Sequence, residues 1–220
     1  MRPISPISPT SPLIKVCGMR DADNIRAVDG LPVDLIGFIF WPKSSRYVSE
    51  VPAYLPTKCK RVGVFVDAAI DDICQHIADY RLDFVQLHGH ESPDYLRLFR
   101  SLYGDSIAII KAFNIATLED FEQTVPYEDF VDYFLFDTKG KAVGGNGEKF
   151  DWSVLTYYDG KTPFFLSGGI GPDDAERLKK LSAVKGFPTD RHVGIDLNSR
   201  FESAPGLKDI VKLKTFLSYE

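Results

Sequence analysis

The stretch R-V-G-V-F-V-D-A-A-I-D-D-I-C-Q-H-I-A-D-Y-R-L-D-F-V-Q-L-H, residues 61–88, contains the unit from which the rest of the chain is built. It begins with an apolar, β-branched run at 61–67, continues with helical spacing at 70–80, and ends in a second apolar run at 84–88. Parallel strands must be joined by a crossover, which is usually a helix. The stretch therefore predicts a strand, a helix and a second, parallel strand.

The same pattern, an apolar β-branched run followed by a segment with helical spacing, recurs along the chain with a period of about 25 residues. It predicts eight strands, at Leu13–Cys17, Asp34–Phe40, Arg61–Asp67, Phe84–His88, Ile107–Phe113, Tyr133–Asp137, Pro163–Ser167 and His192–Leu197. It also predicts helices after them, at Asp21–Asp29, Glu50–Leu55, Ile70–Tyr80, Ser92–Tyr103, Thr117–Val125, Asp151–Tyr158, Pro172–Leu181 and Pro205–Leu217. Ser92 before Pro93 is typical of a capped helix start.

Apolar parallel strands with crossover helices form either an open, doubly wound sheet or a closed barrel. Eight strand–helix units within roughly 210 residues favour closure, so we expect an α/β fold of the (β/α)8 TIM-barrel type. An open sheet with extra edge strands stays the alternative on periodicity alone.

Composition narrows the function classes. The chain has 220 residues, of which 44% are hydrophobic and 26% charged, as expected for one globular domain. Its apolar stretches are shorter than the roughly 20 residues that span a bilayer, so we expect a cytoplasmic protein with no membrane partner. A net charge of −5 without a lysine or arginine run disfavours nucleic acid as a partner. Three scattered cysteines indicate thiols and neither disulfides nor a zinc site.

The first twelve residues differ from everything after them. They read M-R-P-I-S-P-I-S-P-T-S-P, and proline lacks a backbone donor and fixes the chain in extended form. We expect residues 1–12 to be a flexible leader and residues 13–220 to form a single catalytic barrel domain.

Polar residues stand where the strands are predicted to end. In a β/α barrel the active site lies at the carboxyl ends of the strands. The endings I-K-V-C-G, Q-L-H-G, F-L-F-D and I-D-L-N-S place Cys17, His88, Asp137 and Asp196 at one mouth. Each also has a structural reading: Cys17 as a small packing residue, Asp137 as a helix cap or ion-pair partner, and His88 as a hydrogen-bonded rim residue, which is the stronger reading for His88.

Strand alternation turns Lys15 and Cys17 to the same face, and Asp137 to the face of Leu135. A thiol and a carboxyl can then both point inward, as an acid and base pair needs. A neighbouring cation favours the thiolate, so Lys15 is predicted to tune Cys17.

A candidate phosphate site follows the last two strands. Gly168 and Gly169 close the seventh strand, and Asn198 and Ser199 follow the eighth. Barrels commonly hold a phosphate on backbone N–H groups at these places, and glycine lets the backbone approach an anion closely.

Several blocks in this order resemble one known family, phosphoribosylanthranilate isomerase of tryptophan biosynthesis. They are I-K-V-C-G-M-R-D (14–21), G-F-I-F-W-P-K-S-S-R-Y-V-S (37–49), R-V-G-V-F-V-D (61–67), V-Q-L-H-G (85–89), F-D-T-K (136–139), G-G-N-G-E-K-F-D-W (144–152), L-S-G-G (166–169), and G-I-D-L-N-S-R-F-E with P-G-L-K-D (194–209).

The resemblance implies an isomerase that converts the small molecule phosphoribosylanthranilate by an acid–base Amadori rearrangement, without a metal or cofactor, as a monomer or homodimer. It implies Cys17 as the base, Asp137 as the acid, and Arg46 as the group that holds the substrate carboxylate. His88 and Asp196 are expected to contact substrate. Arg46 has an alternative reading as a surface arginine paired with Glu50.

Two places depart from the family pattern. Arg200 stands where a glycine is expected, and the loop at 145–149 differs in detail. Other functions also stay open at this point: an epimerase with a metal cluster, an aldolase using Lys111 or Lys139 as its Schiff-base lysine, or a non-catalytic barrel that binds a phosphorylated ligand.

Overall fold

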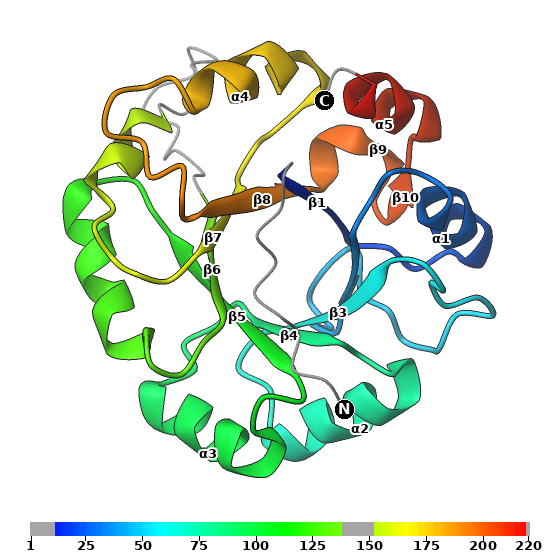
Figure 1. The fold of residues 1–220 in the computed structure, drawn as a ribbon. Coiled ribbons are helices and arrows are strands. Elements are labelled where there is room, and N and C mark those ends of the chain that lie inside the picture. Colours follow the sequence, from blue (N-terminus) through cyan, green and yellow to red (C-terminus); the bar gives the residue numbers. More distant parts are fainter. Residues whose placement is uncertain (1–11, 138–151, 219–220) are drawn as a thin grey trace.

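The structure is a computed structural model that describes residues 12–137 and 152–218. Within these residues eight parallel strands close into a barrel in sequence order, with β8 paired to β1 (Figure 1). The strands are β1 Leu13–Cys17, β2 Leu35–Ile39, β3 Lys60–Phe65, β4 Phe84–Leu87, β5 Ala108–Asn114, β6 Tyr133–Asp137, β7 Phe164–Ser167 and β8 His192–Leu197. The predicted TIM barrel is confirmed, and the open sheet is excluded.

Side chains leave the strands alternately inward and outward, and each set builds its own core. Inward residues such as Leu135 and Phe165 fill the barrel. Outward residues such as Phe134, Phe136 and Phe164 pack under the surrounding helices. Because the barrel centre is filled, the inward positions near the carboxyl ends of the strands are the ones left to form a site.

Helices surround the barrel, in α and 3-10 form. The α-helices are α1 Ala22–Asp29, α2 Ile70–Tyr80, α3 Pro93–Tyr103, α4 Ala175–Leu181 and α5 Ile210–Leu217. The 3-10 helices are η1 Leu118–Tyr127, η2 Trp152–Tyr157, η3 Pro172–Asp174 and η4 Ser199–Phe201. The predicted cap at Ser92 is confirmed, since its side chain accepts a hydrogen bond from the Tyr95 amide.

The predicted helix at Glu50–Leu55 is wrong, because the chain between β2 and β3 contains no helix. Pro52 and Pro56 remove backbone donors that a helix needs. The segment is fastened instead by the buried carboxylate of Asp29, which accepts hydrogen bonds from the amides of Thr57 and Cys59, each at 2.9 Å. These bonds lower the pKa of Asp29, although burial alone would raise it.

The predicted helix at Pro205–Leu217 begins five residues late. The start of the predicted range belongs instead to a hairpin, in which β10 Leu207–Lys208 pairs with β9 Glu202–Ala204, and α5 starts only at Ile210. Gly206, with φ of +81°, forms the turn after Pro205. This hairpin follows β8 and brings two charged residues to the mouth of the barrel.

In the part of the chain that the structure describes, no helix is long and apolar enough to cross a membrane. The predicted leader lies outside the described residues except for its last residue, and so does the loop at 145–149.

Candidate active site

A cavity of about 340 Å³ lies at the carboxyl ends of the strands. All of the site residues predicted from the sequence line it: Cys17, Arg46, His88, Asp137, Gly168, Gly169, Asp196, Asn198 and Ser199. Residues from both ends of the sequence therefore meet at one place, as strand-end positions in a closed barrel must.

Cys17 and Asp137 end strands β1 and β6, and both side chains are buried at the cavity. In the closed sheet, β7 and β8 stand between these two strands. The ends of β7 and β8 carry the candidate phosphate-binding groups, Gly168–Gly169 and Asn198–Ser199. A ligand anchored there by its phosphate would have a thiol on one side and a carboxyl group on the other.

A buried ion pair lies beside the thiol. The Lys15 ammonium donates to Asp196 Oδ1 at 2.9 Å, and both side chains are almost fully buried. Burial raises the pKa of Cys17; the charge of Lys15 lowers it, and Asp196 raises it again, so that the balance lies above the ordinary value. The charge of Lys15 thus favours the thiolate, as the strand alternation predicts, but burial outweighs it and the pKa of Cys17 stays above its ordinary value.

The turn after β7 has the backbone form that its glycines permit. Gly168 and Gly169 have φ of +100° and +67°, a region that residues with a Cβ rarely adopt. A Cβ at Gly169 would meet no other atom within 4 Å, so backbone conformation and not crowding calls for glycine there. Such a turn can present backbone N–H groups to an anion.

Arg200 needs no special backbone conformation. The positive-φ residues other than glycine in the described ranges are Asp67 and Arg81, so the departure at 200 does not strain the chain. The exposed side chain of Arg200 lies beside Gly171, with Nε 3.2 Å from where a Cβ on that glycine would be. Its charge is thus close to the loop that carries Gly168 and Gly169.

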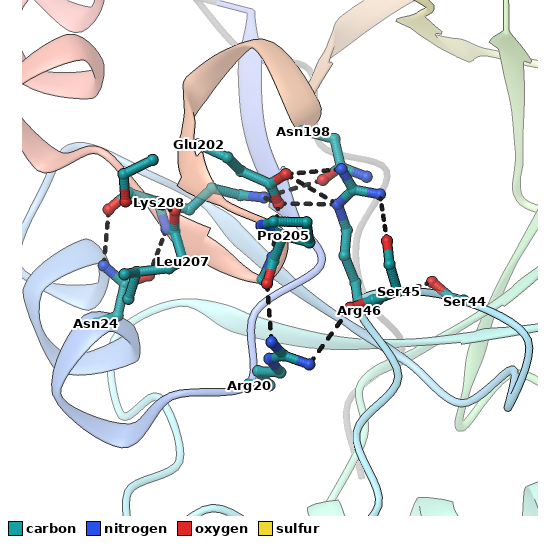
Figure 2. Close-up of polar contacts among 12 residues, drawn as sticks. Arg20, Asn24, Ser44, Ser45, Arg46, Asn198, Glu202, Pro205, Leu207 and Lys208 are labelled. Carbon is teal, nitrogen blue, oxygen red and sulfur yellow. Dashed lines mark hydrogen bonds and ion pairs between the residues drawn. The ribbon is translucent and has the colours of Figure 1, made fainter.

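Arg46 is held by a residue that sequence reasoning missed. Its Nε and Nη2 donate to both carboxylate oxygens of Glu202, at 2.7 to 3.0 Å, and the alternative pairing with Glu50 is not among its contacts (Figure 2). Lys208 Nζ also donates to Glu202, at 2.6 Å, and to Asn198 Oδ1, at 2.9 Å. Burial lowers the pKa of Lys208, and Glu202 opposes that shift.

His88 has a second missed neighbour in the cavity wall. Gln86, inward on β4 and buried, places Nε2 3.3 Å from His88 Nδ1. Both residues line the cavity. An inward polar residue two positions before a strand end was the available signal in V-Q-L-H-G.

Lys111, a candidate for a Schiff-base lysine, does not line the cavity. It is buried, and its ammonium donates to Gly89 O at 2.8 Å and Glu91 Oε2 at 3.1 Å. Lys139, the other candidate, lies outside the described residues. Among the described residues, no group of three His, Cys, Asp or Glu side chains is arranged to hold a metal ion.

Residues 14–219 match the family described as N-(5′-phosphoribosyl)anthranilate (PRA) isomerase. The chain is 50% identical over 211 residues to the N-(5′-phosphoribosyl)anthranilate isomerase of Parabacteroides distasonis, covering 93% of this chain and 91% of the relative. It is 44% identical over 206 residues to that of Phocaeicola vulgatus, covering 94% and 96%.

Solved structures of phosphoribosylanthranilate isomerases also resemble this chain. The phosphoribosylanthranilate isomerase of Thermotoga maritima superposes with a TM-score of 0.75 at 32% identity, covering 95% of this chain and 98% of that one. Another solved isomerase, with a TM-score of 0.73 at 30% identity and the same coverage, is in complex with reduced 1-(o-carboxyphenylamino)-1-deoxyribulose 5-phosphate.

Proposed function

The chain belongs to the phosphoribosylanthranilate isomerase family, and we propose that it converts N-(5′-phosphoribosyl)anthranilate into 1-(o-carboxyphenylamino)-1-deoxyribulose 5-phosphate in tryptophan biosynthesis. The observation that carries this proposal is the shared cavity of Cys17 and Asp137, with the ends of β7 and β8 between them. The arrangement supplies a proton donor, a proton acceptor and an anion site, which the rearrangement needs together.

Asp137 acts as the general acid. Its carboxyl proton passes to the furanose ring oxygen while the C1′–O4′ bond breaks, and the nitrogen lone pair forms a C=N double bond. The Asp137 carboxyl group is buried at the cavity, on the inward face of β6 with Leu135, which is where a general acid must stand.

Cys17 acts as the general base. As a thiolate, it takes the C2′ proton, and the electrons of that C–H bond form a C1′=C2′ double bond and neutralise the iminium nitrogen. The resulting enol passes its hydroxyl proton to C1′ and becomes the ketone, and the Cys17 thiol returns its proton to the Asp137 carboxylate through solvent, which restores both groups. Substrate and product are isomers, so no oxidant or reductant enters the balance.

The other lining residues hold the substrate. The guanidinium of Arg46 pairs with the anthranilate carboxylate. Backbone amides at Gly168 and Gly169, with Asn198 and Ser199, hold the phosphate. His88 and Asp196 contact the sugar between these two anchors.

Turnover of phosphoribosylanthranilate, followed by loss of its fluorescence, tests the proposal. Cys17→Ser and Asp137→Asn each lower kcat by at least about a hundredfold, the usual effect of losing a general acid or base. Cys74→Ser and Asp129→Asn make the same chemical changes away from the cavity and keep near wild-type turnover. If the two cavity variants also keep it, the assignment of acid and base is refuted.

We also propose an oligomeric state and a cellular location for the protein. A Thermotoga maritima relative has been solved as monomers derived from a dimeric enzyme, and we infer a monomer or homodimer here. The single catalytic domain at 13–220 acts on a small biosynthetic intermediate, which points to the cytoplasm. Size-exclusion chromatography with light scattering decides between the two oligomeric states.

A further inference from the structure

Glu202 and Lys208, on the hairpin β9–β10, take no part in the proton transfers proposed above. Both lie in sequence blocks that resemble the family, and both side chains are nearly fully buried. They connect Arg46, after β2, to Asn198, after β8, at the edge of the cavity (Figure 2). Their position next to a substrate-binding arginine calls for a function.

The contact between Glu202 and Arg46 uses one edge of the guanidinium. The Nε and Nη2 hydrogens on that edge meet the two carboxylate oxygens in a bidentate pair. A guanidinium has five N–H donors, and on the opposite edge Nη1 makes only a long contact of 3.5 Å to the exposed Ser45 hydroxyl, so that edge can still donate to another carboxylate. Arg46 lines the cavity and its side chain is 22% exposed, whereas that of Glu202 is 5% exposed.

The charges of this cluster do not balance. Two cations, Arg46 and Lys208, share the one carboxylate of Glu202. The third partner, Asn198, is neutral. The cluster therefore keeps a net positive charge at the cavity, and a ligand carboxylate would complete it.

The hairpin that carries Glu202 is itself tied down. Asn24 on α1 bonds both the amide and the carbonyl of Lys208, at 2.7 and 2.9 Å. Arg20 donates to Pro205 O at 2.9 Å, and the amide of Gly206 donates to Glu202 at 3.1 Å. A carboxylate on so many fixed contacts gives Arg46 one orientation, which is what a positioning residue must do.

We propose that Glu202, supported by Lys208, is a positioning residue that orients Arg46 toward a carboxylate on the aromatic ring of the substrate, and so makes the enzyme selective for a carboxylated arylamine. The inference rests on the proposed function, because it needs Arg46 to bind the anthranilate carboxylate. It goes further in assigning selectivity to a residue that does not touch the substrate.

Two substrates separate this role from a structural one. Phosphoribosylanthranilate carries the carboxylate, and N-(5-phosphoribosyl)aniline, made from aniline and ribose 5-phosphate, lacks it. Glu202→Gln loses the negative charge and one of the two acceptor oxygens that Arg46 and Lys208 share, so KM for phosphoribosylanthranilate rises roughly tenfold with little change in kcat. Both constants for the aniline substrate stay within about twofold of wild type. Asp129→Asn, in an exposed ion pair with Lys161, is the matched control and changes neither.

A double-mutant cycle with Arg46→Ala identifies the path of the effect. If Glu202 acts through Arg46, Glu202→Gln adds nothing to KM in the Arg46→Ala background. Additive losses, or equal losses on both substrates, overturn the inference. Glu202→Asp replaces Glu202→Gln if the latter fails to fold. It keeps a negative charge beside Lys208, but its side chain is one methylene shorter, so we expect the same selective rise in KM.

The outcomes also separate this inference from the proposed function. No turnover of phosphoribosylanthranilate by the wild-type protein refutes the function, and an unchanged KM in Arg46→Ala refutes the carboxylate contact. A raised KM in Arg46→Ala with an unchanged KM in both Glu202 variants refutes the positioning role alone.

Discussion

Two buried ion-pair clusters at the carboxyl end of the barrel differ in their balance of charge. Lys111 and Glu91 form a one-to-one pair, 2% and 1% exposed, that also bonds the carbonyl of Gly89 and lies away from the cavity. Arg46 and Lys208 share Glu202, and Arg46 lines the cavity. A balanced pair holds backbone in place, whereas an unbalanced cluster keeps a charge for a ligand.

The buried ion pair beside the Cys17 thiol is balanced in charge, like Lys111 and Glu91. Lys15 and Asp196 are matched one to one and shift the pKa of Cys17 in opposite directions, and burial is the largest influence on it. Charge balance thus decides not only where a ligand binds but also how readily the proposed base loses its proton.

Breaking the balanced Lys111–Glu91 pair has the largest expected effect. Lys111→Met leaves Glu91 buried without its cation, which costs about 3–5 kcal/mol in the free energy of unfolding. KM of the folded protein stays within about twofold, since the pair does not reach the cavity. Urea unfolding and steady-state kinetics measure the two quantities. A small loss of stability together with a large rise in KM would mean that this pair, too, serves the ligand.

The titration of Cys17 depends on its burial and on the charges of Lys15 and Asp196. Burial holds the pKa of Cys17 above its ordinary value, so its thiol should stay protonated through neutrality and ionise only on the alkaline side. Asp196→Asn removes the anion that offsets Lys15 and should move the Cys17 titration, followed by thiolate absorbance at about 240 nm against Cys17→Ser, to lower pH. A shift to higher pH would contradict the charge argument.

Removing one cation from the unbalanced cluster has a smaller effect on binding. Lys208→Met leaves Arg46 and Glu202 as a neutral pair, so we expect KM for phosphoribosylanthranilate to rise about fivefold, equivalent to about 1 kcal/mol. The aniline substrate is the control, and its KM should change less. An equal rise for both substrates would show that Lys208 supports the cavity as a whole.

Breaking an exposed ion pair should have the smallest effect on stability and on KM. Lys161 and Asp129 contact at 2.9 Å, with both side chains more than two-thirds exposed. Lys161→Ala should leave both the free energy of unfolding and KM near their wild-type values. A loss comparable to that of Lys111→Met would indicate that burial is not what distinguishes the clusters.

The strand ends were predictable because they follow from local pattern. Alternation along a five-residue strand is enough to turn Lys15 and Cys17 to the same face, and closure of the barrel then brings Cys17 and Asp137 to one cavity. Neither inference needs a contact between distant side chains.

What the sequence could not provide depends on such contacts. Arg46 and Glu202 are 156 residues apart, and nothing in either segment alone indicates that they pair. The helix predicted at Pro205–Leu217 includes the turn and the second strand of the hairpin, because the pairing of that strand with Glu202–Ala204 is not visible in the spacing of apolar residues. The segment at 50–55 was misassigned for a similar reason, since Asp29 fixes the chain that follows it from an adjacent helix.

The most direct test of whether the Cys17 thiol and the Asp137 carboxyl group act on one sugar is a crystal structure of this protein with a product analogue. The analogue is reduced 1-(o-carboxyphenylamino)-1-deoxyribulose 5-phosphate. The account predicts Cys17 Sγ within about 4 Å of the ligand's C2 atom and an Asp137 oxygen within about 3.2 Å of the hydroxyl derived from the ring oxygen, with the phosphate at Gly168–Gly169. A ligand bound in the cavity with either group turned away from the sugar would contradict it.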